Sequence, residues 1–404
     1  MSASHPIRTR ELVGMMSMVM ALSAMAIDFM TPAFGEIRTH FQMGSESTAA
    51  AQIITVFFLG EVAQVIYGPL SDRYGRLPIL RLGFAVYVAG SIASALAPTF
   101  AVMLAARLVW GLGAAALQVS AASIIRDRFR GDEMARVMSL IMAIFLIVPV
   151  FAPLGGAALL AASSWQVVFA FPAGLAVIVF GWSLRLNESR PESNIVAMNV
   201  SAIGRAARFV LSNRVTRRYT LGAMMLFAAF STFLSSFERV IGELYGRPSL
   251  FPIAFGTMTA VAAMVMLGNR RLVNRLGAKR TSVVMLSINL TVAALFVVGS
   301  VASQGIPPLG ATLGLLTIIL AVNTAASVNF GSLALEPMGE QAGMAAAFYG
   351  SFYVGGGAAL GWLIDRQLSV SLTPWAIALV VSAAGALMLM PTSRLRRAEH
   401  PIEV

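Results

Sequence analysis

The chain has 404 residues, of which 58% are hydrophobic and 12% are charged, and its mean hydropathy is +0.79. A soluble chain carries about 25% charged residues, so this composition excludes an ordinary soluble domain and predicts an all-α integral membrane protein. The absence of cysteine excludes disulfides, thiolate metal sites and cysteine nucleophiles. The sequence contains no metal-binding cluster, phosphate-binding loop or Ser/His/Asp set, so we expect no metal, no cofactor and no enzymatic activity.

Twelve apolar segments are long enough to cross a membrane as helices, since each crossing needs about 20 residues. In chain order we expect these spans at 12–34, 49–69, 78–97, 100–125, 137–161, 166–185, 219–237, 251–268, 281–302, 309–333, 343–363 and 374–391.

Basic side chains are distributed unequally between the two sides of this arrangement. Twenty-four Arg and Lys residues lie in the tails or in loops on the same side as the tails. Four lie on the other side: Arg38, Arg239, Arg247 and Arg366. Because cytoplasmic loops are enriched in basic residues, we expect a multi-pass protein of the inner membrane with both termini in the cytoplasm. The same distribution explains the net charge of +11 without a nucleic-acid partner.

The longest polar stretch divides the spans into two groups of six. We expect residues 1–185 and 219–404 to form two halves, joined by a cytoplasmic linker at 186–218. Within the linker, the basic segment 203–218 is either a helix on the inner membrane surface or a plain connector. Two echoes indicate an internal duplication. Asp72-Arg73-Tyr74-Gly75 recurs after 202 residues as Asn274-Arg275-Leu276-Gly277, and Gly155-Gly156 recurs after 201 residues as Gly356-Gly357.

Three ionisable residues lie inside otherwise apolar spans: Asp28, Glu61 and Arg107. A charge at the centre of a bilayer costs about 2.5–3.5 kcal/mol, so such residues are typical of water-filled paths along which protons or ions move. Asp28 and Arg107 lie at similar depth in spans 1 and 4, and we expect them to face one cavity. Two alternatives remain open: a static ion pair between Asp28 and Arg107, and a lipid-facing position for Glu61.

The second half contains no acid inside a predicted span and offers only the amides Asn289, Asn323 and Asn329. We therefore expect proton coupling to reside in the first half, with Asp28, Glu61 and Arg107 as its residues. Asp28, Arg107 and Asn323 are expected to line a substrate cavity whose apolar wall comes from both halves.

The loop between spans 2 and 3 has a distinctive sequence, Gly68-Pro69-Leu70-Ser71-Asp72-Arg73-Tyr74-Gly75-Arg76. It closely resembles the loop signature of the major facilitator superfamily, with Leu77 where that family usually has a basic residue. The resemblance implies a cytoplasmic conformational latch formed by Gly68, Asp72, Arg73, Gly75 and Arg76. Asp127 is the expected partner of Arg73 or Arg76. The alternative is that the loop acts as a topology signal alone.

Three further segments resemble members of the same family. Span 4 carries Arg107 followed by small residues, with Trp110 in place of the usual glutamine. Span 5 resembles the antiporter signature of proton-driven drug exporters through Pro149, Pro153, Gly155 and Gly156, although Ala152 and Ala157 replace two glycines. Span 1, over residues 27–33, resembles the Bcr/CflA-type drug exporters.

The resemblance implies twelve transmembrane helices in two pseudo-symmetric six-helix halves. It also implies proton-coupled efflux of small, partly apolar molecules by a monomer embedded in membrane lipid. The partners are then protons and a small-molecule substrate. Export of a specific native metabolite or siderophore is an alternative within this class. A transport-inactive membrane sensor or structural protein is an alternative from another class.

Overall fold

The computed structural model describes residues 8–44, 47–190, 204, 207–208, 212–368 and 370–391, and within these ranges it contains helices and connecting turns without strands. Ten helical stretches of the described residues are long and apolar enough to cross a membrane, and Thr373–Leu389 is a shorter apolar helix. The predicted span 343–363 falls on a helix that a π-helical turn interrupts. This all-helical architecture confirms the predicted fold class.

The first half comprises the helices up to residue 190. Its elements are α1 (Thr9–Asp28), η1 (Thr31–Ala33), α2 (Phe34–His40), η2 (Thr48–Ala51), α3 (Gln52–Glu61), α4 (Gln64–Tyr74), α5 (Arg76–Ala95), α6 (Phe100–Arg128), α7 (Gly131–Ala162) and α8 (Trp165–Ser183). The tightest packing within it joins α5 to α6, α3 to α6, α5 to α8 and α1 to α7.

The second half begins at Arg214, so the last five residues of the predicted linker belong to its first helix. Its elements are α10 (Arg214–Arg239), η4 (Val240–Leu244), η5 (Pro248–Leu250), α11 (Phe251–Leu276), α12 (Ala278–Ala302), α13 (Leu309–Leu335), η6 (Glu336–Gln341), α14 (Ala342–Ser351), η7 (Phe352–Gly356), α15 (Gly357–Asp365) and α16 (Thr373–Leu389). Of the predicted surface segment 203–218, residues 203, 205–206 and 209–211 lie outside the described residues.

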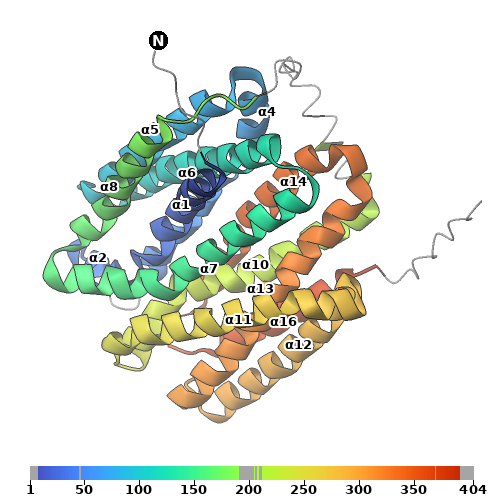
Figure 1. The fold of residues 1–404 in the computed structure, drawn as a ribbon. Helices are drawn as coiled ribbons and strands as arrows, with labels where there is room; N and C mark the ends of the chain where they lie inside the picture. Colours follow the sequence, from blue (N-terminus) through green and yellow to red (C-terminus); the bar gives the residue numbers. More distant parts are fainter. Residues whose placement is uncertain are drawn as a thin grey trace, which may run out of the picture.

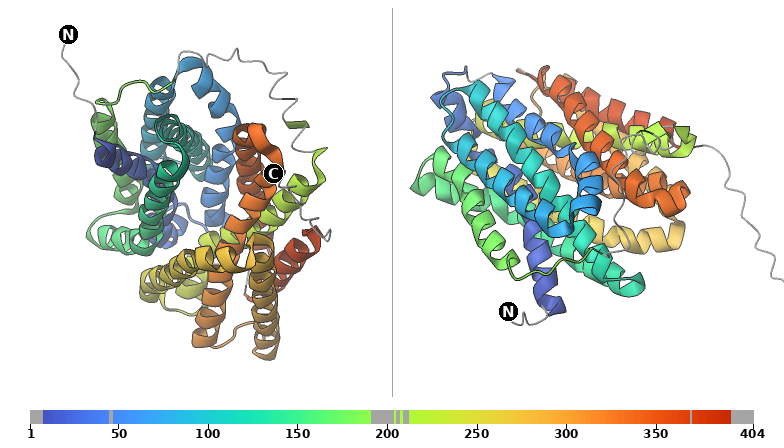
Figure 2. Two further views of the ribbon diagram at one scale, coloured as in Figure 1. Left: turned by 45° about the vertical axis from the view of Figure 1, so that its right-hand side comes forward. Right: turned by 90° about the horizontal axis from the view of Figure 1, so that it is seen from above.

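The two halves form separate groups of helices, blue to green and yellow to red, in Figure 1 and in the left view of Figure 2. They meet along a few helix pairs: α7 packs on α11, α4 on α14, and α3 on α10 and α15. A space enclosed by these contacts lies between the halves, where transporters of paired-half architecture place their binding sites.

Two predicted spans are interrupted where the sequence suggested continuous helices. Span 1 breaks between α1 and η1, directly after Asp28, and Pro32 in η1 cannot donate a backbone hydrogen bond. Span 2 breaks after Glu61, where Val62 and Ala63 donate to the carbonyls three residues earlier instead of four. Both acids therefore lie at helix breaks.

An ion cluster joins the halves at the end of the bundle opposite to the start of α1. The Arg38 guanidinium on α2 donates to both Glu238 oxygens on α10, at 3.0 and 3.2 Å. It also lies 2.6 Å from a Glu243 oxygen on η4. Arg38 is only 5% exposed, and Glu238 is also buried. Since a buried guanidinium needs compensating charge, this cluster ties α2 of the first half to α10 of the second.

Arg38→Gln is expected to leave Glu238 buried without its cation and to destabilise the protein by up to about 3–5 kcal/mol, the range for breaking a buried pair. The midpoint of thermal unfolding of purified protein measures this effect. Arg366→Gln is the matched control, since Arg366 is exposed and stacks on Trp362. Equal midpoints for the two variants would contradict a structural role for the cluster.

Candidate functional site

A cavity of about 470 Å³ lies between the halves, within the size range of small-molecule sites. Helices α1, α3, α4, α6 and α7 supply its first-half wall, and α10, α11, α13, α14 and η7 supply the other. Its lining is mainly apolar and aromatic. The polar side chains among the lining residues are Ser23, Asp28, Glu61, Gln64, Gln118, Asn323, Thr324, Ser327, Tyr349 and Tyr353.

Glu61 lines this cavity at the end of α3 and is 4% exposed. The hydroxyl of Ser23 on α1 donates to one of its oxygens, and the amide nitrogen of Gln118 on α6 lies 3.3 Å from the same oxygen. Glu61 therefore faces the protein interior and not lipid. Sequence reasoning missed both partners, because a serine and a glutamine within apolar helices carry no motif.

Asp28 lines the same cavity at the last residue of α1. Its backbone carbonyl accepts a hydrogen bond from the Thr31 hydroxyl at 2.8 Å. Within the described ranges, no donor or cation lies within bonding distance of its carboxylate. Asp28 thus differs from Glu61: it is a buried acid that faces the cavity without a protein partner.

Arg107 is fully buried on α6 and does not lie among the residues that line the cavity. Its side chain donates to the carbonyl oxygens of Ile53 at 3.1 Å and Ala26 at 3.0 Å. The guanidinium lies over the rings of Phe57 and Trp110, 4.5 and 4.6 Å from their centroids.

The expectation that Arg107 shares the cavity surface with Asp28 is therefore corrected, and the described residues contain no ion pair between the two. Two residues at equal depth on neighbouring helices need not face the same cavity. Arg107 instead binds the backbone of α1 two residues before Asp28 and the backbone of α3 at Ile53, and it lies near enough to Glu61 to attract its charge.

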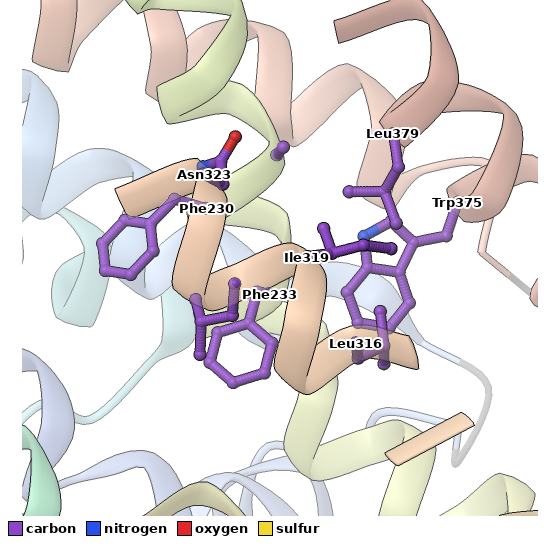
Figure 3. Close-up of a pocket in the computed structure, with 9 residues that line it drawn as sticks. Phe230, Phe233, Leu316, Ile319, Asn323, Trp375 and Leu379 are labelled. Atoms are coloured by element: carbon purple, nitrogen blue, oxygen red, sulfur yellow. The ribbon is translucent and has the colours of Figure 1, made fainter. Parts of the chain in front are cut away.

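Asn323 on α13 lies in the cavity wall as predicted. Its amide nitrogen donates to the Leu226 carbonyl at 3.0 Å, and its amide oxygen lies 3.4 Å from the Asn289 nitrogen. On its other side is a small apolar pocket whose lining includes Phe230 and Trp375; Figure 3 shows Asn323 and Phe230 at one end and Trp375 at the other. The third amide, Asn329, pairs with Asn269 on α11 at 2.9 Å.

The second half does contain buried acids, contrary to the sequence-based expectation. Glu238 belongs to the ion cluster, and Asp365 is 1% exposed at the end of α15. Asp365 accepts hydrogen bonds from Ser235 at 2.6 Å and Ser236 at 2.8 Å. Both acids were missed because the predicted spans ended at 237 and 363, one and two residues too early. Neither lines the central cavity.

The latch residues meet at the end of the bundle that also holds the start of α1. The Arg76 guanidinium binds Asp127 with an Nε to oxygen distance of 2.7 Å and also pairs with Asp72. Arg73 does not share this role: its guanidinium stacks on the ring of Tyr74. Of the two arginines considered as partners of Asp127, the geometry selects Arg76.

Two residues of the segment after α8 complete the latch and were not predicted. The Glu188 carboxylate accepts from the backbone N–H groups of Arg76 at 2.9 Å and Leu77 at 3.0 Å, which are the first residues of α5. The Arg190 guanidinium donates to the backbone carbonyls of Asp72 and Arg73 at the end of α4. An anion at a helix start and a cation at a helix end both complement the helix dipole.

A second cavity of about 530 Å³ lies between the central cavity and the latch. Gln64 and Gln118 line both, and Gly68, Asp72 and Arg126 line the second alone. The Arg38 cluster closes the bundle at the other end. The second cavity therefore adjoins the central one on the latch side of the bundle.

The prolines and glycines of span 5 shape contacts of α7 with both halves. An added Cβ at Gly156 would lie 1.9 Å from the Phe29 carbonyl oxygen, so a glycine permits the approach of α7 to the end of α1. Pro153 has no N–H, so the Pro149 carbonyl lacks its usual helical donor. The hydroxyl of Thr259 on α11 lies 3.2 Å from that oxygen and 2.8 Å from the Phe255 carbonyl of its own helix. The Gly256 carbonyl lies 3.1 Å from the same hydroxyl, which can donate its single proton to only one of these three oxygens at a time.

Gly75→Ala is expected to destabilise the protein more than Gly277→Ala, because only Gly75 lies in the latch. Both glycines join consecutive helices with φ of +107° and +79°, a region that side chains avoid at about 1–3 kcal/mol. Only at Gly75 would the new Cβ also meet a side chain, 2.7 Å from a Glu188 oxygen, whereas the space at Gly277 is open. Thermal unfolding of the two variants checks the order, and a larger loss for Gly277→Ala would contradict it.

Glu188→Gln is expected to destabilise the protein near neutral pH but not in acid. Partial burial raises the pKa of Glu188, but the backbone N–H groups of Arg76, Leu77, Arg190 and Ser189 outweigh it, so the pKa lies below its ordinary value. A lowered folded-state pKa adds stability above the unfolded value of about 4.3, which is lost as pH falls through the folded value. Unfolding midpoints from pH 7 down to pH 3 should therefore converge for the two proteins. A constant difference would refute the capping role.

Comparisons with known proteins agree with this architecture. Residues 15–361 match the family model of the Major Facilitator Superfamily. The chain is 24% identical to an uncharacterized MFS-type transporter, YdgK, of Bacillus subtilis, over 95% of each chain. It is 25% identical to a bicyclomycin resistance protein homolog of Haemophilus influenzae over 87% of each chain. It is 30% identical to the multidrug resistance protein MdtL of an Escherichia coli strain (O6:K15:H31), over 76% of this chain and 77% of that one.

Solved structures show the same fold at low sequence identity. A D-xylose–proton symporter superposes with a TM-score of 0.73 at 12% identity, covering 95% of this chain and 98% of the other. A bacterial homolog of the human lysosomal transporter Spinster, in an inward-facing and unoccupied conformation, gives a TM-score of 0.71 at 13% identity, covering 95% and 96%. With the family model matched over most of its length, this multi-pass membrane protein belongs to the major facilitator superfamily of transporters.

Proposed function

We propose that this protein exports small, partly apolar molecules across the inner membrane in exchange for protons. The observation that carries the proposal is that two buried acids, Asp28 and Glu61, line one largely apolar cavity between the halves. The resistance functions in the names of two relatives support an exported substrate. The antiporter-like Pro149, Pro153, Gly155 and Gly156 of α7 support exchange over co-transport.

Asp28 is the proposed proton carrier. Its carboxylate has no partner within the described ranges, so its charge can be compensated by a proton or by a bound molecule. Substrate and proton then compete, and the weakening of each by the other is reciprocal. Glu61 is the proposed second coupling residue, held by Ser23 and Gln118, and Arg107 positions both acids through the backbone of α1 and α3.

The remaining assignments belong to the same proposal. Gly68, Asp72, Arg73, Gly75, Arg76 and Asp127 form the proposed cytoplasmic latch, in which Arg73 contributes its backbone carbonyl, and Glu188 and Arg190 of the 186–218 linker complete it. Both termini then lie in the cytoplasm, and the protein acts as a monomer without enzymatic activity. The substrate is either a drug-like compound or a native metabolite or siderophore. The acid-lined cavity between the halves disfavours a transport-inactive sensor.

Asp28→Asn is expected to abolish proton-driven accumulation of substrate in inverted vesicles, because the amide keeps the size of the side chain and removes its proton. Glu61→Gln is the matched comparison, with a smaller or substrate-selective defect expected. The assay needs an uphill substrate gradient, since a 100 mV potential supplies only about 2.3 kcal/mol per charge moved. Normal uphill transport by Asp28→Asn with an inactive Glu61→Gln would reverse the assignment. Normal transport by the double variant would refute coupling through these acids.

A further inference from the structure

The two equivalent turns of the duplicated halves differ in charge. In the first half, the turn between α4 and α5 holds its own anions: Asp72 pairs with Arg76, and Glu188 binds the start of α5. The equivalent turn between α11 and α12 has Asn274 in place of Asp72, and the sequence contains no Asp or Glu from residue 244 to residue 335. The second turn therefore lacks the acids that serve the first.

The second turn nevertheless carries several cations. Four exposed arginines, which we call the α11–α12 arginine surface, flank it: Arg270, Arg271 and Arg275 at the end of α11, and Arg280 in the first turn of α12. Within the described ranges, no acid lies within ion-pair distance of any of them. Lys279 differs, because its ammonium donates to a backbone carbonyl beyond the end of α16 at 2.6 Å. The arginine surface thus has no counter-charge from the described protein.

On α11, exposed apolar side chains lead directly to these arginines. Met264 and Leu267 are 62% and 64% exposed. Spacings of three and four residues place them on one helix face with Arg271 and Arg275. The opposite face of α11 is fixed by Asn269, which is buried and donates to an amide of α13 at 2.9 Å. The outward face of α11 therefore passes from apolar side chains to cations at its end.

The neighbouring helix repeats this arrangement. α12 packs against α11, and the face that begins with Arg280 continues at intervals of four residues to Val284 and Ile288, which are 44% and 42% exposed. α11 begins near the Arg38 cluster, and its 26 residues span about 39 Å, so the arginine surface lies at the latch end of the bundle. The ends of membrane-spanning helices lie at the level of the lipid headgroups.

We propose that the α11–α12 arginine surface binds the phosphate of an anionic membrane phospholipid, whose acyl chains lie along the apolar faces of α11 and α12. The lipid supplies the negative charge that acids of the chain supply at the equivalent turn of the first half. Basic side chains at a membrane surface attract anionic lipid, and arginine can bind a phosphate through two parallel N–H groups. Because α11 also packs on α7, this lipid contacts a helix that joins the two halves.

Two lipids that share a phosphate but differ in net charge test the proposal: anionic phosphatidylglycerol and zwitterionic phosphatidylcholine. Each is titrated into purified, delipidated protein in detergent, and native mass spectrometry counts the lipid molecules that stay bound. We expect phosphatidylglycerol to bind at least about tenfold more tightly and to raise the midpoint of thermal unfolding. Equal binding of the two lipids would overturn the proposal.

Two triple variants with the same change in net charge separate this surface from a general attraction between basic protein and anionic lipid. Arg271→Gln/Arg275→Gln/Arg280→Gln should lose the preference for phosphatidylglycerol. The control should keep it, and changes three exposed arginines at the latch end of the first half: Arg81→Gln/Arg130→Gln/Arg136→Gln. Equal losses in the two variants would refute a specific surface on α11 and α12.

Inorganic phosphate and glycerol 3-phosphate distinguish a lipid from a soluble phosphate as the source of the charge. We expect neither to displace bound phosphatidylglycerol at millimolar concentration, since neither has acyl chains to cover the apolar faces of α11 and α12. Displacement by either compound, or equal stabilisation by it, would overturn the assignment to a lipid. These measurements involve no transport, so their outcome is independent of the proposed export function.

Discussion

Lipid offers no hydrogen-bond partners, so every polar group within the bundle must be satisfied by the protein itself or by water that the protein admits. This constraint explains the site as much as the fold. Two nitrogens of Arg107 meet it with backbone carbonyls of two neighbouring helices, and the guanidinium lies over two aromatic faces, while its third nitrogen is buried without a hydrogen-bond partner among the described residues. Asp365 meets it with two serine hydroxyls of α10. The Asp28 carboxylate has no such partner among the described residues and faces the cavity, which makes it the natural place for an exchangeable partner.

The same constraint separates what the sequence predicts from what it does not. Apolar length locates the ten helices that are long enough to cross a membrane and the shorter helix Thr373–Leu389, because the bilayer fixes helix length. Asp28 and Asn323, which were expected to line a cavity, do line the space between the halves, since an interior polar residue has few other positions available. The partners of these residues could not be predicted. Whether Arg107 points to a cavity or to a neighbouring backbone depends on helix rotation, which no single helix encodes.

Errors of one or two residues in the predicted helix ends led to larger errors in the predicted positions of buried acids. A boundary one or two residues short removed Glu238 and Asp365 from the predicted spans, and the second half then appeared to lack buried acids. Glu188 and Arg190 were assigned to a linker, although they bind the ends of α5 and α4. The duplicated halves also differ at equivalent turns: Gly75 meets a side chain that has no counterpart at Gly277. Backbone geometry is thus repeated more faithfully than the contacts built on it.

The spacing of Pro149 and Pro153 has a consequence for communication between the halves. Two prolines four residues apart expose a backbone oxygen on α7, and only a neighbouring element can supply its donor. Thr259 on α11 is within reach, yet its hydroxyl is equally committed to its own helix. The Thr259 hydroxyl can therefore donate to α7 or to its own helix, and the choice depends on the distance between α7 and α11 at this point. The vibrational frequency of an isotope-labelled Pro149 carbonyl would report that hydrogen bond directly, without any attached probe.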